Sequence, residues 1–224
     1  RFRNVTGVQT CALPICLEVN KIEDADLAEK QKDPALAKYG PWLRDLRVWR
    51  PHQLSDEMEK ALHEKYVVGR AAWSRLFDET IARLRYPFGN EMLSEPQILD
   101  KLSNKDAAVR REAAKSFGKV QGDNIAIFSL VTNTLAKDKE IEDRWRKYKR
   151  PQSSMNLANV VEDEVVDALV AAVKAAYPRL AHRYYKLKAK WFGVDRMPYW
   201  DRNAPLPDHD DRVIPWPEAE KIVL

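Results

Sequence analysis

Apolar side chains recur every three or four residues along most of the chain, which is the spacing of an amphipathic helix. The clearest pattern begins after Ser55, a suitable N-cap, where Asp56 and Glu57 also favour the positive end of a helix dipole. Its apolar positions are Met58, Leu62, Tyr66, Gly69, Trp73, Leu76, Phe77, Thr80, Ile81 and Leu84. The pattern predicts a single helix of about thirty residues.

Proline and glycine mark the boundaries of the neighbouring elements. Pro34 suits the first turn of a helix carrying Leu36, Tyr39, Leu43, Leu46 and Trp49. Gly40-Pro41 should bend or split that helix, and Pro51 should end it. In "LRYPFGNEML", Pro87 and Gly89-Asn90 break the long helix and predict a short hairpin or loop.

The second half of the chain continues the helical pattern. Two smaller helices are expected around 96–102 and 106–117, and a second long one from near Asn124 to Tyr148. Glu162, Asp163 and Glu164 crowd the first turn of a helix that carries Val165, Val166, Leu169, Val170 and Val173. Pro178 should open a further helix, with Leu180, Tyr184, Leu187 and Trp191 spaced by four, three and four residues.

After Gly193 the chain is punctuated by proline, which predicts extended structure with one or two short strands before a last helix from Pro217. The fold class is therefore mainly α. We expect about eight helices, with short strand or extended segments near 85–93 and 196–216.

The first sixteen residues do not share this pattern. "VTGVQTCALPIC", residues 5–16, has no helical or strand period, and residues 5–15 match the translation of a widely used sequencing adapter. We therefore expect 1–16 to be foreign to the fold, like a fusion scar, and 17–224 to form the folded part. The final helix reaches Leu224 without a cap or breaker, so we expect the chain to be cut at both ends.

Composition narrows the cellular setting. Cys11 and Cys16 are the only cysteines, so the expected fold has no disulfide or catalytic thiol and suits a reducing, cytoplasmic location. The sequence contains no run of about 18 apolar residues, so it predicts no membrane-spanning helix. The net charge of +4 falls to +2 without Arg1 and Arg3, which indicates a solvated surface rather than a polyanion partner.

The four histidines form no recognisable metal motif. His52 follows a proline at a helix junction and is expected to be structural. His63 is followed by Glu64, but a zinc peptidase helix needs a second histidine four residues on, and that position is Val67. His182 lies on a charged helix face, and His209 lies in the loop sequence "DHDD", which is more typical of a solvated loop than of a cation site.

Other catalytic patterns are also missing from the sequence. It has no glycine-rich phosphate loop and no G-x-S-x-G elbow. The paired carboxylates Glu140/Glu142 and Glu162–Glu164 are explained by solvated faces and helix starts. We therefore assign no catalytic and no metal-binding residue within the chain.

Two stretches combine aromatic and basic residues, "DRWRKYKRP" and "HRYYKLKAKWF". They could bind nucleic acid through phosphate contacts and base stacking. The interpretation we favour is that the apolar members are buried while lysine and arginine stay in water. That interpretation buries Trp145, Tyr148, Tyr184, Leu187 and Trp191.

Longer phrases resemble a known family. "RPHQLSDEMEKALHEK", "GRAAWSRLFDETIARLRYPF", the run from "NTLAKDKEIEDRWRKYKRP" to "HRYYKLKAKWFGV", and "YWDRNAPLP" are similar, in this order, to the oligoendopeptidase F family. This family is the bacterial branch of the thimet-oligopeptidase-like zinc peptidases. The resemblance covers nearly all of 17–224. It rests on sequence segments that are typical of the family's helix packing, and none of them is a catalytic motif.

The resemblance implies a mostly helical ellipsoid with a deep channel that admits short peptides. It also implies zinc held by an H-E-x-x-H helix and a further glutamate, with the first glutamate as general base. In the family that motif follows the "APLP" region, so here it would lie beyond Leu224. The chain is then an N-terminal lobe, inactive alone, of a cytoplasmic peptidase; the alternative is a non-enzymatic helical scaffold or protein-interaction domain.

Overall fold

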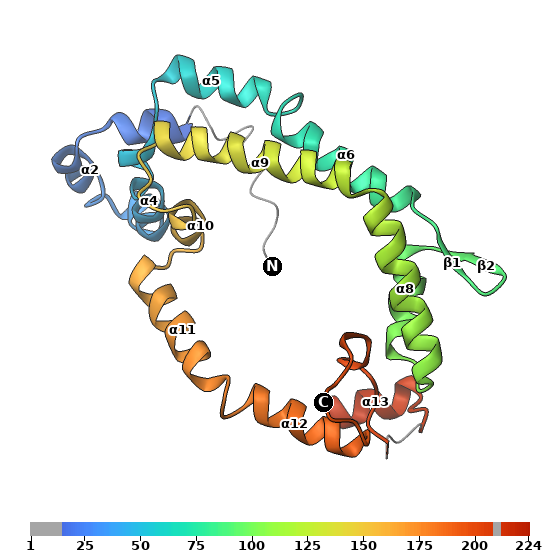
Figure 1. The fold of residues 1–224 in the computed structure, drawn as a ribbon. Helices are drawn as coiled ribbons and strands as arrows, with labels where there is room; N and C mark the ends of the chain where they lie inside the picture. Colours follow the sequence, from blue (N-terminus) through green and yellow to red (C-terminus); the bar gives the residue numbers. More distant parts are fainter. Residues whose placement is uncertain (1–14, 208–211) are drawn as a thin grey trace. The chain divides into compact units, whose positions relative to one another are not determined.

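The computed structural model describes residues 15–207 and 212–224, and the chain divides into two compact units. The first unit comprises the described residues up to Glu79 together with Ala126–Ala172. The second comprises Thr80–Ile125 and the described residues from Val173 onward. Each unit is built almost entirely of helices (Figure 1), so the prediction of a mainly α protein is confirmed.

The first unit is all-helical in the part of the chain that the structure describes. Residues 15–21 are helical. The elements that follow are α2 (Asp24–Lys30), α3 (Pro34–Ala37), α4 (Gly40–Arg47), the 3₁₀ turn η1 (Arg50–His52), α5 (Asp56–Lys65), most of α6 (Arg70–Arg83), α9 (Ile125–Trp145), α10 (Ser153–Ala158) and most of α11 (Asp163–Ala176).

The expected split at Gly40-Pro41 is confirmed, since α3 ends at Ala37 and α4 begins at Gly40. The expectation of one long helix after Ser55 is wrong. Ser55 caps α5 as expected, but α5 ends at Lys65 and α6 begins only at Arg70. At the break the chain passes close to itself: a side chain on Gly69 would meet the Lys65 carbonyl oxygen at 3.0 Å. Apolar periodicity continues across this tight turn, so it could not reveal the break.

The second unit contains the only strands among the described residues. β1 (Tyr86–Phe88) and β2 (Glu91–Leu93) form an antiparallel hairpin in which Tyr86 pairs with Leu93. Gly89 has φ +55°, the left-handed conformation that a tight hairpin turn requires. The hairpin expected from "YPFGNEML" is therefore confirmed.

Helices pack against this hairpin. They are α7 (Glu95–Asp100), the 3₁₀ turn η2 (Lys101–Ser103) and α8 (Ala107–Asp123), and their apolar side chains form a small core with the strands. Tyr86, Ile98 and Ala113 are fully buried there, and the Tyr86 ring stacks on Phe117 at 5.5 Å between centroids. Gln121 Nε2 donates a hydrogen bond to the Tyr86 hydroxyl at 2.9 Å, so the polar end of this buried ring is satisfied.

The rest of the second unit comprises α12 (Ala181–Trp191), the 3₁₀ turn η3 (Tyr199–Asp201) and α13 (Trp216–Val223). α12 begins three residues later than the position of Pro178 predicted. Over the described residues of 196–216 the chain forms no strand, so that part of the expectation is wrong. The closely spaced prolines of this segment remove the backbone donors that a strand ladder needs.

Candidate functional site

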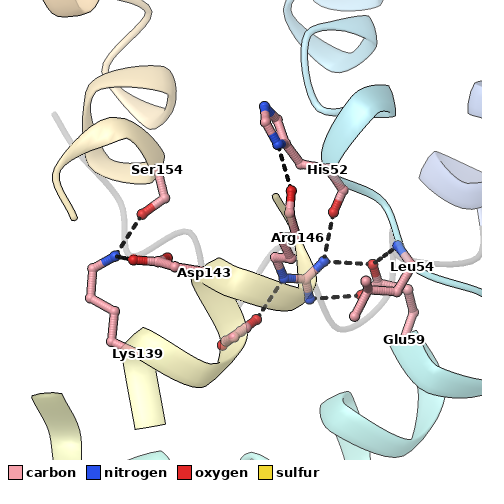
Figure 2. Close-up of polar contacts among 8 residues, drawn as sticks. His52, Leu54, Glu59, Lys139, Asp143, Arg146 and Ser154 are labelled. Atoms are coloured by element: carbon pink, nitrogen blue, oxygen red, sulfur yellow. Dashed lines mark hydrogen bonds and ion pairs between the residues drawn. The ribbon is translucent and has the colours of Figure 1, made fainter. Parts of the chain in front are cut away.

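A partly buried ion pair links α5 to the end of α9 in the first unit (Figure 2). Arg146 donates from Nη1 to Glu59 Oε1 at 2.6 Å and from Nη2 to Glu59 Oε2 at 3.0 Å, which is the bidentate geometry of a strong charge-assisted pair. Its Nε donates to Glu142 Oε1 at 2.7 Å. The Leu54 N–H also donates to Glu59, at 2.9 Å.

The way in which α9 ends determines where the side chains of Arg146 and Tyr148 lie. Lys147 has φ +60°, the Tyr148 N–H donates to the Asp143 carbonyl, and the Lys147 N–H donates to the Arg144 carbonyl. This is the Schellman ending of a helix, in which one left-handed residue reverses the chain. The reversal directs Arg146 and Tyr148 toward the turn that precedes α5.

His52 completes this cluster. Its Nδ1 lies 2.8 Å from the Arg146 carbonyl oxygen; because a carbonyl only accepts, Nδ1 carries the hydrogen. Arg146 Nη1 donates in return to the His52 carbonyl at 3.2 Å, and the imidazole stacks on Tyr148 at 4.1 Å between centroids. His52 thus holds two elements together, as the sequence led us to expect.

Burial and hydrogen bonding act in opposite directions on Glu59. Burial raises its pKa, but the hydrogen bonds from Arg146 and from the Leu54 N–H outweigh burial and lower it overall. Burial also raises the pKa of Tyr148, to about 12. Glu59 is therefore ionised and fully engaged with Arg146, and this cluster is structural rather than catalytic.

Further polar contacts tie α10 to its neighbours. Lys139 donates to Asp143 at 2.5 Å and to Ser154 Oγ at 3.0 Å, which joins α9 to α10 (Figure 2). Ser153 and Asn156 each donate to Asp163 at 2.7 Å, at the start of α11. These two hydrogen bonds lower the pKa of Asp163.

The second unit has its own buried cluster of charge. Arg110, on α8, donates from Nε to Asp201 at 2.7 Å and from Nη1 to the Asn104 and Lys105 carbonyls at 2.7 and 2.8 Å. Lys188, on α12, donates from Nζ to the Arg202 and Ala204 carbonyls at 2.9 and 2.8 Å. Both cations lie near the Phe192 ring. Together they fix the loop that follows η3.

In this cluster the single carboxylate of Asp201 lies near two cations, Arg110 and Lys188. Burial is the main reason that the pKa of Lys188 is lowered, and the nearby Arg110 guanidinium lowers it further. A lysine with a lowered pKa is a common catalytic feature. Here, however, the ammonium group is directed at two backbone carbonyls, and an anchoring role accounts for it.

The other histidines and carboxylates considered above form no site. His63 lies half-buried on α5, and Val67 falls in the turn beyond that helix. His182 is exposed and lies beside Tyr177, and His209 lies outside the described residues. Glu140 bonds Lys137 and Arg144 along one face of α9, and Glu142 bonds Arg146. In residues 15–207 and 212–224, no three His, Cys, Asp or Glu side chains come together as metal ligands.

The expectation that the aromatic side chains of the two basic stretches are buried is mostly wrong. Tyr148 is half-buried on His52, but the others are exposed: Trp145, Tyr184, Leu187 and Trp191. Helical spacing places Tyr184, Leu187 and Trp191 on one face but does not show whether anything covers that face.

Two depressions in the described surface can be defined. A depression of about 450 Å³ in the first unit is lined by α2, α3 and α4, including Leu43, Arg44 and Arg47. Another of about 280 Å³ in the second unit lies between Pro87 and α8. Neither contains a group of metal ligands. None of the described helices is both long and apolar enough to cross a membrane.

Sequence reasoning missed the charged residues that carry the buried contacts: Glu59, Arg110, Lys188 and Asp201. One signal was available for Arg110, which occurs among the apolar positions Val109, Ala113, Ala114 and Phe117 of its helix. No local pattern pairs it with Asp201, because these two residues are 91 apart in the sequence.

Comparisons with known proteins agree on one family. The family model described as Oligopeptidase F matches residues 18–86. Group B oligopeptidase PepB of Streptococcus agalactiae serotype III (strain NEM316) is 26% identical over 183 residues, which cover 79% of this chain and 30% of PepB. The chain thus spans about a third of the length of that relative.

Solved structures show the same fold. Oligoendopeptidase-F from Enterococcus faecium aligns with a TM-score of 0.74 and 24% identity over 84% of this chain and 38% of its own. A provisionally assigned peptidase from Chlamydophila abortus aligns with a TM-score of 0.77 and 17% identity, over 96% of this chain and 37% of its own. Together with the resemblance of the sequence phrases, these matches show that the chain is similar to the N-terminal part of oligoendopeptidase F proteins.

Proposed function

We propose that this chain is the N-terminal portion of a zinc-dependent oligoendopeptidase that hydrolyses short peptides. The match to the Oligopeptidase F family model over residues 18–86, at the start of the helical part, carries the proposal. In it, residues 17–224 form a helical lobe of a cytoplasmic enzyme, residues 1–16 are foreign to the fold, and catalytic residues and zinc ligands lie in a part that this chain does not span.

The described residues do not fit a zinc ion. A catalytic zinc needs three protein ligands within about 2.0–2.3 Å of the metal, and among these residues no such group converges. The buried carboxylates Glu59 and Asp201 are each paired with an arginine. The proposal therefore assigns this chain a structural part in the enzyme and no chemical step.

The test compares the 224-residue chain with the product of the same gene extended beyond Leu224. We expect the chain to retain no stoichiometric zinc in metal analysis and to leave an internally quenched peptide uncleaved. The extended product should bind zinc and cleave the peptide, and a chelator should stop it. Metal-dependent cleavage by the 224-residue chain, or an extended frame without an H-E-x-x-H sequence, would refute the proposal.

The alternative is a helical scaffold that binds other proteins without catalysis. The many exposed large apolar side chains give this alternative some support, because such surfaces mark interaction sites. It predicts an extended gene product without peptidase activity, so the same assay separates the two functions.

A further inference from the structure

The second unit presents an apolar surface with a defined position on α12. Leu180, Tyr184, Leu187 and Trp191 are 62%, 44%, 42% and 46% exposed. Their spacing of four, three and four residues places them on one face of the helix and its first turn. We call this face the α12 stripe.

The stripe is not needed to hold α12 in place. The helix is anchored through Lys188 and Ala189, which are buried, and Lys188 binds the carbonyls of the loop after η3. The packing contacts of α12 thus lie beside the stripe, which stays open in the part of the chain that the structure describes.

Positive charge runs along the stripe. Arg183 and Lys190 lie one turn on either side of Leu187, and both are exposed, as is Lys186. Between Asp167 and Asp195 the sequence has no acidic residue. Among the described residues, Arg183, Lys186 and Lys190 have no carboxylate partner. An occupant of the stripe should therefore combine apolar side chains with negative charge.

We propose that the α12 stripe is a docking site for a peptide in which apolar and acidic side chains alternate. This proposal rests on the proposed function, because it specifies a class of peptide for the enzyme. From residue 180 to 191 the stripe is about 16 Å long, the length of about five residues of extended peptide. The apolar side chains of such a peptide would contact the stripe, and its carboxylates would attract Arg183 and Lys190 over a longer range.

A nucleic acid fits the stripe less well. Single-stranded nucleic acids bind through aromatic platforms on which successive bases stack. In the stripe, Leu187 lies between the aromatic rings of Tyr184 and Trp191 along the helix, and Leu180 precedes both. Leucine offers apolar contact but no ring for stacking, so the composition favours a peptide.

The test measures fluorescence anisotropy of a fluorescein-labelled Leu-Glu-Leu-Glu-Leu-Glu-Leu peptide titrated with the 224-residue chain. We expect saturable binding that weakens with salt, and no binding of the matching peptide with lysine in place of glutamate. Reversing the two flanking charges, Arg183→Glu with Lys190→Glu, should weaken binding by about tenfold, because two attractions become repulsions. Leu187→Ser should also weaken binding without changing the net charge.

The matched control is Arg111→Glu with Lys115→Glu, two exposed positions on α8 in the same unit. It changes the net charge by the same amount and should bind the acidic peptide like the unchanged chain. Circular dichroism of each variant separates loss of the site from loss of fold. Equal weakening in the control, equal binding of the lysine peptide, or displacement by a single-stranded oligonucleotide would overturn the proposal. Self-association that excludes the peptide would also overturn it.

In the last arm of the test, the same acidic peptide is titrated with the extended gene product. A chelator is present so that the peptide is not cut. If the extended product does not bind the acidic peptide, the stripe is an internal packing surface and the proposal is wrong. This result is independent of cleavage, which is measured with zinc and the quenched peptide. Loss of docking and loss of peptidase activity are therefore distinguishable.

Discussion

At the scale of single residues, buried charge in this chain is neutralised by side chains that bind several acceptors at once. Arg110 binds one carboxylate and two carbonyls, and Arg146 binds two carboxylates and one carbonyl. Removing one partner from such a cluster leaves the other charge buried and unpaired, which costs more than the pair contributes. These contacts are therefore the sites where single substitutions should have the largest effect.

Arg110→Lys should lower the free energy of unfolding by about 3 kcal/mol, although it keeps the charge. An ammonium group cannot reproduce the fork that reaches Asp201 and the two carbonyls together. Urea denaturation followed by circular dichroism measures the change. The control is Arg111→Lys, an exposed neighbour that should change stability by less than about 0.5 kcal/mol. Equal stability of the two variants would contradict this role for Arg110.

The Glu59 pair should make stability depend on pH. Because the folded state lowers the pKa of Glu59 below its ordinary 4.5, the ionised carboxylate stabilises the fold at neutral pH. This contribution is lost as pH falls through the folded pKa. Glu59→Gln should cost about 2 kcal/mol at pH 7, and the difference from the unchanged chain should shrink in acid. Urea titrations at several pH values between 7 and 3 test this, and a constant difference would contradict it.

At the scale of elements, the sequence predicts where structure begins more reliably than where it ends. Ser55 marks the start of α5 and Gly89-Asn90 the hairpin turn, since both signals are local. After α9, the left-handed position that reverses the chain is occupied by Lys147. The glycine that usually marks such a helix ending is therefore missing. The sequence also gave no signal for α10. The polar side chains that hold it, Ser153 and Asn156, have their partner Asp163 on the next helix.

The ends of α10 and α12 lead to two linked predictions about stability. α10 and α12 end in the same hydrogen-bond pattern, but the left-handed position is Val160 in one and Gly193 in the other, with φ +52° and +65°. Val160→Gly should raise the free energy of unfolding by about 1 kcal/mol, because a β-branched residue is strained there. Gly193→Ala should lower it by a similar amount, since its Cβ would meet no atom within 4 Å and only backbone strain remains. Thermal and urea unfolding of both variants should give changes of opposite sign, and changes of the same sign would refute this explanation.

At the scale of the whole molecule, two helical units each have a polar anchor, but much apolar surface is left uncovered. Many exposed large apolar side chains lie in or beside α11, α12 and α13, and they include Leu169, Leu180 and Trp216. Amphipathic spacing predicted the helices, but it could not tell a face that is buried within the chain from one that remains open. The family resemblance, by contrast, implied further protein beyond these residues.

This open surface leads to a prediction for the isolated chain. Native 224-residue protein should bind 8-anilinonaphthalene-1-sulfonate and enhance its fluorescence, because exposed apolar surface binds this dye. The extended gene product should give less fluorescence per mole, since the proposed function has the added part cover some of this surface. Near-ultraviolet circular dichroism must show fixed tertiary structure in both samples, which excludes dye binding by a loosened core. If the isolated chain is well packed and leaves the dye signal at its baseline, the open surface described for α11–α13 is absent in solution. The lobe would then be self-contained, as the scaffold alternative requires.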